Sequence, residues 1–271
     1  MPVSERVDDR EWSGRDRERA DGETDAPADQ LGLPINELFY SLQGEGTLAG
    51  VPSVFVRTSG CNLRCWFCDS YHTSWEPTHA WLELEAILEE IESFEADHVV
   101  LTGGEPLVHD DSVALLEALA DRDYHTTIET NGTIYRDAPI DLASISPKLA
   151  SSTPTAARAP EGVDVGEWER RHEAERVDLE TLAALVETYD VQLKFVVTDG
   201  DDLPEIHALL EALRDAAAVP IPDDDVLLMP EGATRERLAE TRERVADLAL
   251  EYGFRYTPRL HVDLWNDAPE T

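Results

Sequence analysis

The stretch that decides the fold is residues 58–70, TSGCNLRCWFCDS, which hold all three cysteines of the chain. Cys61, Cys65 and Cys68 are spaced C-x3-C-x2-C. Thiolates are soft ligands, and they select iron–sulfur clusters, zinc or copper(I) over magnesium or calcium. Three of them within eight residues can ligate three irons of a cubane cluster, which normally takes four cysteines. Because the sequence has no fourth cysteine, the fourth iron would stay open to a ligand from outside the protein.

Other interpretations of the three cysteines remain open. A structural zinc site needs four ligands, and His72 could serve as the fourth. Three unconnected buried thiols are a further alternative, although such thiols would be scattered along the chain. Disulfides do not fit an odd number of cysteines crowded into one loop. The spacing therefore favours an incomplete iron–sulfur cluster.

The motifs around this loop resemble a known family. C-x3-C-x2-C with Phe67 before the last cysteine, followed downstream by TGGEP at residues 102–106, resembles the radical S-adenosylmethionine (SAM) superfamily. The flanking text narrows the resemblance: FYSLQGEG at 39–46, FVR at 55–57 and CDS at 68–70 are similar to the 7-carboxy-7-deazaguanine synthases. The similarity extends, with gaps, from about residue 35 to about residue 265.

The composition bounds the class of protein. A chain of 271 residues with 42% hydrophobic residues fits one large α/β domain. No stretch is apolar enough to span a membrane, and the N-terminus lacks a signal-peptide core, so we expect a cytoplasmic protein. Residues 1–30 are rich in acids and arginines and nearly without large apolar side chains, which predicts a disordered acidic tail before a core domain at 31–271.

The net charge of −36 disfavours binding to nucleic acids or to anionic membranes. It suggests adaptation to a salty cytoplasm, where a short Debye length screens the self-repulsion of the chain. We therefore predict that the melting temperature rises between low and molar salt. A melting temperature that stays constant over that range would refute salt adaptation.

Hydrophobic periodicity predicts alternating strands and helices. We expect strands at 35–42, 52–58, 97–102, 124–130, 141–146, 191–198, 225–229 and 254–257, and helices at 80–95, 112–121, 179–189, 203–217 and 234–252. Three successive strands end in polar or glycine-rich text, namely GGEP, ETNG and SPK. In a βα barrel the carboxyl ends of the strands carry the site. Residues 151–178 interrupt the alternation, and we interpret them as a loop or insertion, more a surface excursion than a lid.

The resemblance implies a fold, cofactors and site residues. The expected fold is an incomplete (β/α)6 TIM-like barrel, and the expected cofactors are a [4Fe–4S] cluster on Cys61, Cys65 and Cys68, SAM, and Mg²⁺ at Ser70, where the family commonly has threonine. The residues implied for SAM are Phe67, Cys68, Asp69, Gly104, Glu105, Ser146, Pro147 and Lys148. Those implied for the substrate are Leu42, Gln43, Gly44, Glu45, Arg57, Thr102 and His261.

The resemblance also implies the reaction and the partners. A radical SAM carbon–nitrogen lyase would convert 6-carboxy-5,6,7,8-tetrahydropterin to 7-carboxy-7-deazaguanine with release of ammonia, for the queuosine or archaeosine pathway of tRNA modification. We expect a homodimer, an electron donor such as flavodoxin or ferredoxin, and no direct contact with nucleic acid or membrane. An activase of a glycyl radical enzyme and a zinc-binding interaction module are the alternatives.

Lysine usage adds one expectation from the residues themselves. The chain has only two lysines among its 22 basic residues, Lys148 and Lys194. A chain that has replaced nearly every lysine has kept these two, and both lie in strand-like text. We expect a role in the site for Lys148, because a compact ammonium suits a carboxylate.

Overall fold

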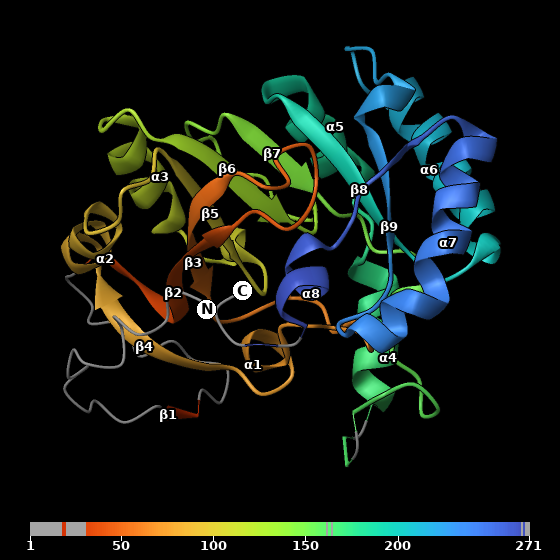
Figure 1. Cartoon of the computed structure of the whole chain (residues 1–271), viewed down its shortest axis with the longest axis horizontal. Helices are drawn as coiled ribbons and strands as arrows, with labels where there is room; N and C mark the ends of the chain where they lie inside the picture. The colour runs from red at the N-terminus through yellow and green to blue at the C-terminus, as the bar shows by residue number, and fades with distance from the viewer. Residues whose placement is uncertain (1–17, 20–30, 161, 164, 267, 269–271) are drawn as a thin grey trace.

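The computed structural model describes residues 18–19, 31–160, 162–163, 165–266 and 268. Its centre is a ten-stranded sheet with the order β1-β4-β2-β3-β5-β6-β7-β8-β9-β10 (Figure 1). The strands are β1 (Glu18–Arg19), β2 (Gly32–Leu42), β3 (Pro52–Thr58), β4 (Thr78–Glu83), β5 (His98–Gly103), β6 (His125–Thr130), β7 (Leu142–Ile145), β8 (Val191–Val197), β9 (Val226–Pro230) and β10 (Arg255–Tyr256).

Six neighbouring strands, β3 and β5 to β9, run parallel, and the short β10 extends the series. β2 pairs antiparallel with β3, and β4 pairs antiparallel with β2. Because β1 and β10 stand at opposite ends of the order, the sheet stays open. The central strands are apolar on both faces, as in Val99–Leu101, which is fully buried. The expected incomplete six-stranded barrel is confirmed.

Helices flank the sheet. They are α1 (Tyr71–Ser74), α2 (Leu84–Glu92), α3 (Ser112–Ala120), α4 (Gly166–Glu175), α5 (Leu179–Thr188), α6 (Leu203–Ala216), α7 (Arg235–Tyr252) and α8 (Leu260–Trp265). Two short ones, α1 and α8, contribute to a cavity at the carboxyl edge of the sheet. In Figure 1, α2 and α3 flank one end of the sheet, α5 to α7 flank the other, and α8 lies between these groups. No helix that the structure describes is long and apolar enough to cross a membrane.

The structure corrects three expectations about secondary structure. Residues 80–83, predicted as the start of a helix, belong to β4, because the open edge of β2 pairs with them. The loop predicted at 151–178 contains α4, whose residues are almost all polar and therefore show no apolar stripe. Helices α1 and α8 were not predicted at all. The tail predicted at 1–30 lies outside the described residues, apart from Glu18–Arg19 in β1.

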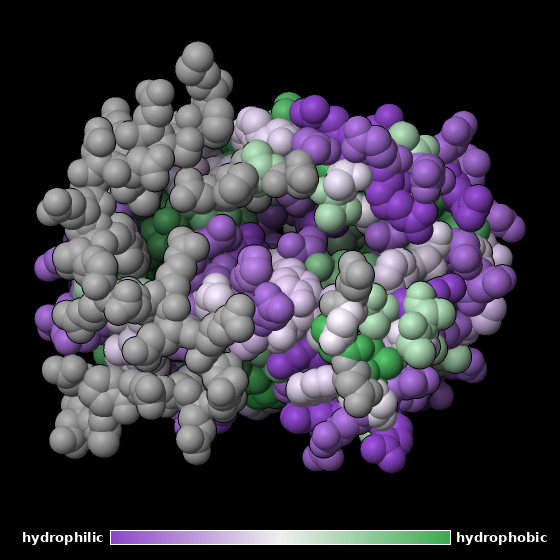
Figure 2. All heavy atoms as spheres, turned by 90° about the horizontal axis from the view of Figure 1, so that it is seen from below, coloured by the Kyte–Doolittle hydropathy of each residue, from purple (hydrophilic) through white to green (hydrophobic). Residues whose placement is uncertain are grey.

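The described surface agrees with the composition. Seen from below, it is mostly hydrophilic, with scattered hydrophobic spots (Figure 2). The core holds the apolar side chains of the strands and of the inward faces of α2, α3, α5, α6 and α7. The polar ends of the strands remain at the carboxyl edge of the sheet, where they line a large cavity.

Candidate functional site

The cavity at the carboxyl edge of the sheet has a volume of about 500 Å³. Parallel strands bring their carboxyl ends to one edge, which is why segments far apart in sequence meet there. The lining includes the predicted site residues Leu42, Gln43, Gly44, Glu45, Arg57, Cys61, Cys65, Phe67, Cys68, Asp69, Ser70, Thr102, Gly104, Ser146, Lys148 and His261. Glu105 and Pro147 are the two predicted site residues outside this lining.

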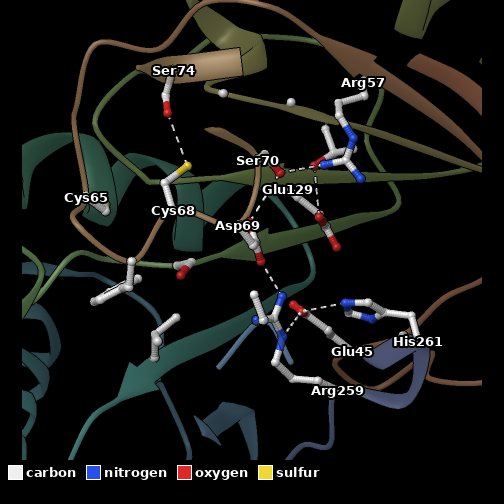
Figure 3. A pocket seen from close by; sticks show the side chains of 18 of the residues that line it. Glu45, Arg57, Cys65, Cys68, Asp69, Ser70, Ser74, Glu129, Arg259 and His261 are labelled. Carbon is white, nitrogen blue, oxygen red and sulfur yellow. Dashed lines mark hydrogen bonds and ion pairs between the residues drawn. The ribbon is translucent and has the colours of Figure 1, made fainter. Parts of the chain in front are cut away.

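Residues 58–70, the cluster loop, bring all three cysteines into the lining of the cavity. Figure 3 shows two of them, Cys65 and Cys68, at one end of it. Burial raises the pKa of the Cys61 and Cys65 thiols to about 12, and it also raises that of Cys68. A cationic ligand is therefore needed to hold them as thiolates. Two donors already point at sulfur: Leu63 N–H to Cys61 Sγ at 3.4 Å and Ser74 Oγ–H to Cys68 Sγ at 3.2 Å.

These sulfurs fit a multi-iron cluster better than a single ion. Throughout the described part of the chain, no three His, Cys, Asp or Glu side chains converge as ligands of one metal ion. A structural zinc ion requires such convergence, with each sulfur about 2.3 Å from the metal. A cubane distributes its ligands over separate irons. Soft donors, burial and hydrogen bonds to sulfur together fit a [4Fe–4S] cluster on the three cysteines.

The segment after β7 holds the cluster loop from outside. Arg64 N–H donates to His172 Nδ1 of α4 at 3.1 Å, and Ser152 Oγ lies 2.8 Å from His172 Nε2. Because the Ser152 hydroxyl donates to Leu149 O, it accepts from Nε2–H, which fixes the tautomer. Trp66 donates to two backbone carbonyls of the short 3-10 helix η3 (Ala150–Ser152), Ser151 O at 2.7 Å through its indole and Ser152 O at 3.1 Å through its backbone. Residues 151–178, interpreted from the sequence as a surface excursion, therefore anchor the loop that carries the cysteines.

Replacing His172 by phenylalanine should loosen this anchor. His172 is fully buried, and burial lowers its pKa to about 4, so it is neutral at pH 7. The change leaves the Arg64 N–H and the Ser152 hydroxyl without their hydrogen-bond partner. A buried polar group that loses its partner costs about 1–3 kcal/mol of stability. We expect a fall of that size in the unfolding free energy of the cluster-free protein, and faster deuterium exchange at the Arg64 amide. His207→Phe, at an exposed histidine, is the control, and equal behaviour of the two variants would contradict the anchor.

The opposite wall of the cavity is a network of buried charges. Lys194 Nζ on β8 lies 2.6 Å from Glu45 Oε2 and 3.8 Å from Glu129 Oε1. Glu129 also accepts hydrogen bonds from Gln43 and Thr102. Although burial alone would raise the pKa of Glu45, the charges of Lys194 and Arg259 hold it well below its usual range. Glu45 is therefore an ionised, fixed acceptor.

Arg259, just before α8, connects this wall to the cluster loop (Figure 3). Its Nε donates to Glu45 Oε1 at 2.9 Å, its Nη2 is paired with Asp69 Oδ2, and its Nη1 donates to Gly232 O at 2.7 Å. Only 6% of Arg259 is exposed. One guanidinium thus fixes the position of the Gln43–Glu45 turn relative to the residue that follows the last cysteine.

Arg57 and Ser70 meet at a third part of the cavity. Arg57 Nη1 donates to Ser70 Oγ at 2.8 Å, and Arg57 Nε lies 2.9 Å from Glu37 Oε2. A register shift between Ile35 and Glu37 interrupts the β2–β3 ladder, and it brings Asn36 and Glu37 to the cavity together. A planar guanidinium beside a hydroxyl suits a ligand carboxylate.

The residues predicted to bind SAM fall into two groups, those that line the cavity and those that lie outside its lining. Gly104 packs so closely that a Cβ would lie 2.2 Å from Gly60 O, which only glycine permits. Lys148 Nζ donates to Ser146 Oγ at 2.8 Å, and both line the cavity. The fully buried Glu105 carboxylate instead accepts hydrogen bonds from Leu107 N–H and from the end of β6. Glu105 therefore shapes the turn after β5.

His261 lies against the glycine turn. A Cβ on Gly44 would lie 1.8 Å from His261 Nδ1, so the two residues fit only because Gly44 has no side chain. His261 Nε2 is 4.0 Å from Glu45 Oε1, and burial lowers the pKa of His261. A neutral imidazole is thus held at the wall beside Glu45.

Sequence reasoning missed three residues of this wall, Glu129, Lys194 and Arg259. Lys194 is one of only two lysines in the chain, which could have pointed to a role in the site, but we expected such a role for Lys148 alone. Glu129 lies in the ETNG text that marked a strand end. Arg259 lies within the region of family similarity but was assigned no role, because its partners Asp69 and Glu45 are 190 and 214 residues away in the chain.

The comparisons with known proteins agree with this geometry. The model of the radical SAM superfamily matches residues 55–152. A 7-carboxy-7-deazaguanine synthase from Halobacterium salinarum is 65% identical, with all of both chains covered. The chain belongs to the 7-carboxy-7-deazaguanine synthase family. A further member from Rhodopirellula baltica is 41% identical over 88% of each chain.

The fold of the family is also found among solved structures. QueE from Escherichia coli superposes with a TM-score of 0.61 at 24% identity, covering 85% of this chain and 95% of that one. At that identity the likeness concerns the fold alone. Membership of a radical SAM family implies a [4Fe–4S] cluster and SAM as cofactors of this chain. The family supports neither the activase nor the zinc module considered from the sequence.

Proposed function

We propose that the chain converts 6-carboxy-5,6,7,8-tetrahydropterin to 7-carboxy-7-deazaguanine with release of ammonia, as a radical SAM carbon–nitrogen lyase. The observation that carries this proposal is the joint lining of one cavity. The three cysteines line one end of it, while the charged wall and the Arg57–Ser70 pair line the rest. Full-length similarity to a synthase of this name supports the same reaction.

Cys61, Cys65 and Cys68 would hold the cluster, which together with SAM supplies a 5′-deoxyadenosyl radical able to take an unactivated hydrogen. The residues of this chain would bind and orient SAM and the substrate, and they would exclude water from the cavity. Phe67, Cys68 and Asp69 would contact SAM beside the sulfurs, Gly104 would contact it through its backbone, and Ser146 and Lys148 would hold its far side. Glu105 and Pro147 would support this subsite from outside the lining.

The substrate carboxylate would bind between Arg57 and Mg²⁺ held by Ser70. The Arg57 and Ser70 side chains are in direct contact, so one carboxylate can reach both. Mg²⁺ prefers oxygen ligands and keeps waters or substrate oxygens in its shell, which suits a single protein hydroxyl. The net charge of −36 repels an anionic substrate at long range. Pairing with Arg57 and Mg²⁺ within the cavity would offset that repulsion.

The pterin ring would lie on the wall formed by the turn after β2. Leu42, Gln43 and Gly44 would contact its faces and edges, and Thr102 and His261 would border it. Glu45 and Glu129 supply fixed acceptors for ring N–H groups, because Lys194 and Arg259 keep Glu45 ionised. Fixed polar groups of this kind orient a ring without reorganising during reaction.

Replacing Ser70 by alanine should weaken the stimulation by magnesium. We expect the Mg²⁺ concentration for half-maximal turnover to rise about ten-fold or more, because the only proposed protein ligand is lost. Ser70→Thr restores a hydroxyl and is the matched control. Unchanged magnesium dependence in Ser70→Ala would make the magnesium assignment wrong.

The function itself is tested by anaerobic reconstitution with iron, sulfide, SAM and reductant. We expect a brown protein that forms 7-carboxy-7-deazaguanine and ammonia from 6-carboxytetrahydropterin. Reconstituted protein that cleaves SAM and leaves the pterin unchanged would contradict the proposed substrate. Protein that binds zinc and no iron would contradict the whole reaction.

The remaining assignments complete the proposal. A cluster on three thiolates requires a reducing compartment, which supports a cytoplasmic location. We assign a homodimer on the resemblance to the family, and a flavodoxin or ferredoxin as the source of the electron. The product would serve the queuosine or archaeosine pathway, without direct binding of tRNA by this acidic chain.

A further inference from the structure

A second cavity lies behind the cluster loop. It has a volume of about 410 Å³ and is lined by Trp66, Arg158, Thr198, Asp199, Arg237, Glu240, Thr241 and Arg244, which we call the Trp66 face. Trp66 is the residue between Cys65 and Phe67, and Phe67 lines the large cavity. The Trp66 and Phe67 rings pack edge to face, with centroids 5.3 Å apart. The rings of Trp66 and Phe67 thus separate the Trp66 face from the end of the large cavity where the cysteines lie.

The charge of the Trp66 face is unusual for this chain. With 58 acids against 22 bases, most arginines within residues 31–266 are paired with carboxylates or backbone carbonyls. Of the guanidinium groups described there, those of Arg158, Arg170 and Arg244 have neither a hydrogen bond nor an ion pair. Two of these three line the Trp66 face. Arg158 is exposed and packs over the Trp66 ring at 5.6 Å, and Arg244 is exposed on α7.

We propose that the Trp66 face is the docking surface for an acidic one-electron carrier protein. This inference rests on the proposed function, since a radical SAM reaction needs an external electron. The carrier loses one electron, the bound cluster gains it, and no bond is made or broken in the protein. Docking here places the redox group of the carrier behind a tryptophan that neighbours a ligand cysteine.

The lining favours a protein over a small anion. Asp199 and Glu240 share the cavity with the arginines, and Arg237 is already paired with Glu231 and Glu240 at 2.6 and 2.8 Å. A compact anion would meet these carboxylates. An extended acidic surface can reach Arg158, which follows η3 (Ala150–Ser152), and Arg244 on α7 separately. Complementary charge of this kind sets encounter and register more than raw affinity.

The Trp66 face is also held rigid, which suits electron transfer through it. The indole of Trp66 donates to Ser151 O at 2.7 Å, and its backbone N–H donates to Ser152 O. Both partners lie in the segment that His172 anchors to the cluster loop. A carrier that binds here therefore contacts a Trp66 ring whose position relative to the cysteines these hydrogen bonds fix.

The test is the double variant Arg158→Glu with Arg244→Glu, compared with Arg122→Glu. Arg122 follows α3 in the chain, and α3 lies at the other end of the sheet from α7 (Figure 1). Turnover is driven either by dithionite or by purified, photoreduced flavodoxin or plant-type ferredoxin. We expect dithionite-driven turnover to stay within about two-fold of wild type, and the KM for the carrier to rise about ten-fold or more. Arg122→Glu should leave both the dithionite-driven turnover and the KM for the carrier unchanged. An unchanged KM for both carriers in the double variant would overturn the docking surface.

A binding measurement separates this inference from the proposed function. Titration of each oxidised carrier into wild-type holoprotein should give a dissociation constant that rises about ten-fold or more in the double variant. This result can hold even if no 7-carboxy-7-deazaguanine forms with dithionite, in which case only the proposed reaction fails. Inorganic phosphate that binds wild type and not the double variant, with carrier binding unaffected, would identify a small-anion site and overturn protein docking.

Discussion

Cys65→Ala is expected to abolish cluster binding and all cleavage of SAM. Cys65 is the middle one of the three proposed cluster ligands, and it is buried at the end of the large cavity. With two thiolates left, two irons of a cubane would lack a protein ligand. Iron and sulfide analysis after anaerobic reconstitution should fall from about four irons per chain to near background. The visible absorption and the formation of 5′-deoxyadenosine should disappear with it.

Ser151→Ala is the matched control for this prediction. Its side chain lies beside the cluster loop, but only its backbone carbonyl holds Trp66, so iron content should stay at the wild-type value. If Cys65→Ala instead kept its full iron, a further side chain would have to complete the ligand set. The open iron, and with it the site for SAM, would then be refuted.

Arg259→Gln is expected to have the second-largest effect, through two losses at once. Removing one partner of a buried ion pair costs about 3–5 kcal/mol, and here Glu45 and Asp69 both lose the guanidinium. The exposed side of Asp69 moderates this cost. The Gln43–Glu45 turn, proposed to bind the pterin, and the cluster loop, proposed to bind SAM, would also lose their common anchor. A misplacement of about 1 Å costs about 100-fold in rate, so product formation should fall by about that factor.

The measurement compares product with 5′-deoxyadenosine. A positioning role predicts that product falls far more than SAM cleavage, whereas a purely structural role predicts equal loss of both. Arg259→Lys should be intermediate, because an ammonium keeps the charge but cannot bridge both carboxylates as the fork does. Arg242→Gln removes an exposed pair with Asp263 and should change stability by less than about 1 kcal/mol. Equal losses in Arg242→Gln and Arg259→Gln would contradict the anchor.

The barrel and the end of the site that holds the cysteines could be predicted from the sequence because their signals are local. The cysteine spacing lies within eight residues, and the strand ends were marked by the polar text that follows them. Parallel strands then bring these ends together without further information. The same rule accounts for Thr102, Ser146 and Lys148 in one cavity.

The rest depends on contacts between distant segments. Helix α4 has only one buried residue, His172, so no apolar pattern announces it, and its hydrogen bond to Arg64 spans 108 residues. Lys194 lies in an apolar strand, and only the fold shows that its ammonium reaches Glu45. Residues 80–83 are apolar enough for either a helix or a strand, and the neighbouring edge of β2 decides between them.

The C-terminal end of the chain has a practical consequence for the handling of the protein. His261, Val262, Asn266 and Ala268 all line the large cavity. An affinity tag fused directly after this segment would begin beside the large cavity. Purification handles, fluorophores and immobilisation linkers therefore belong away from residues 261–268.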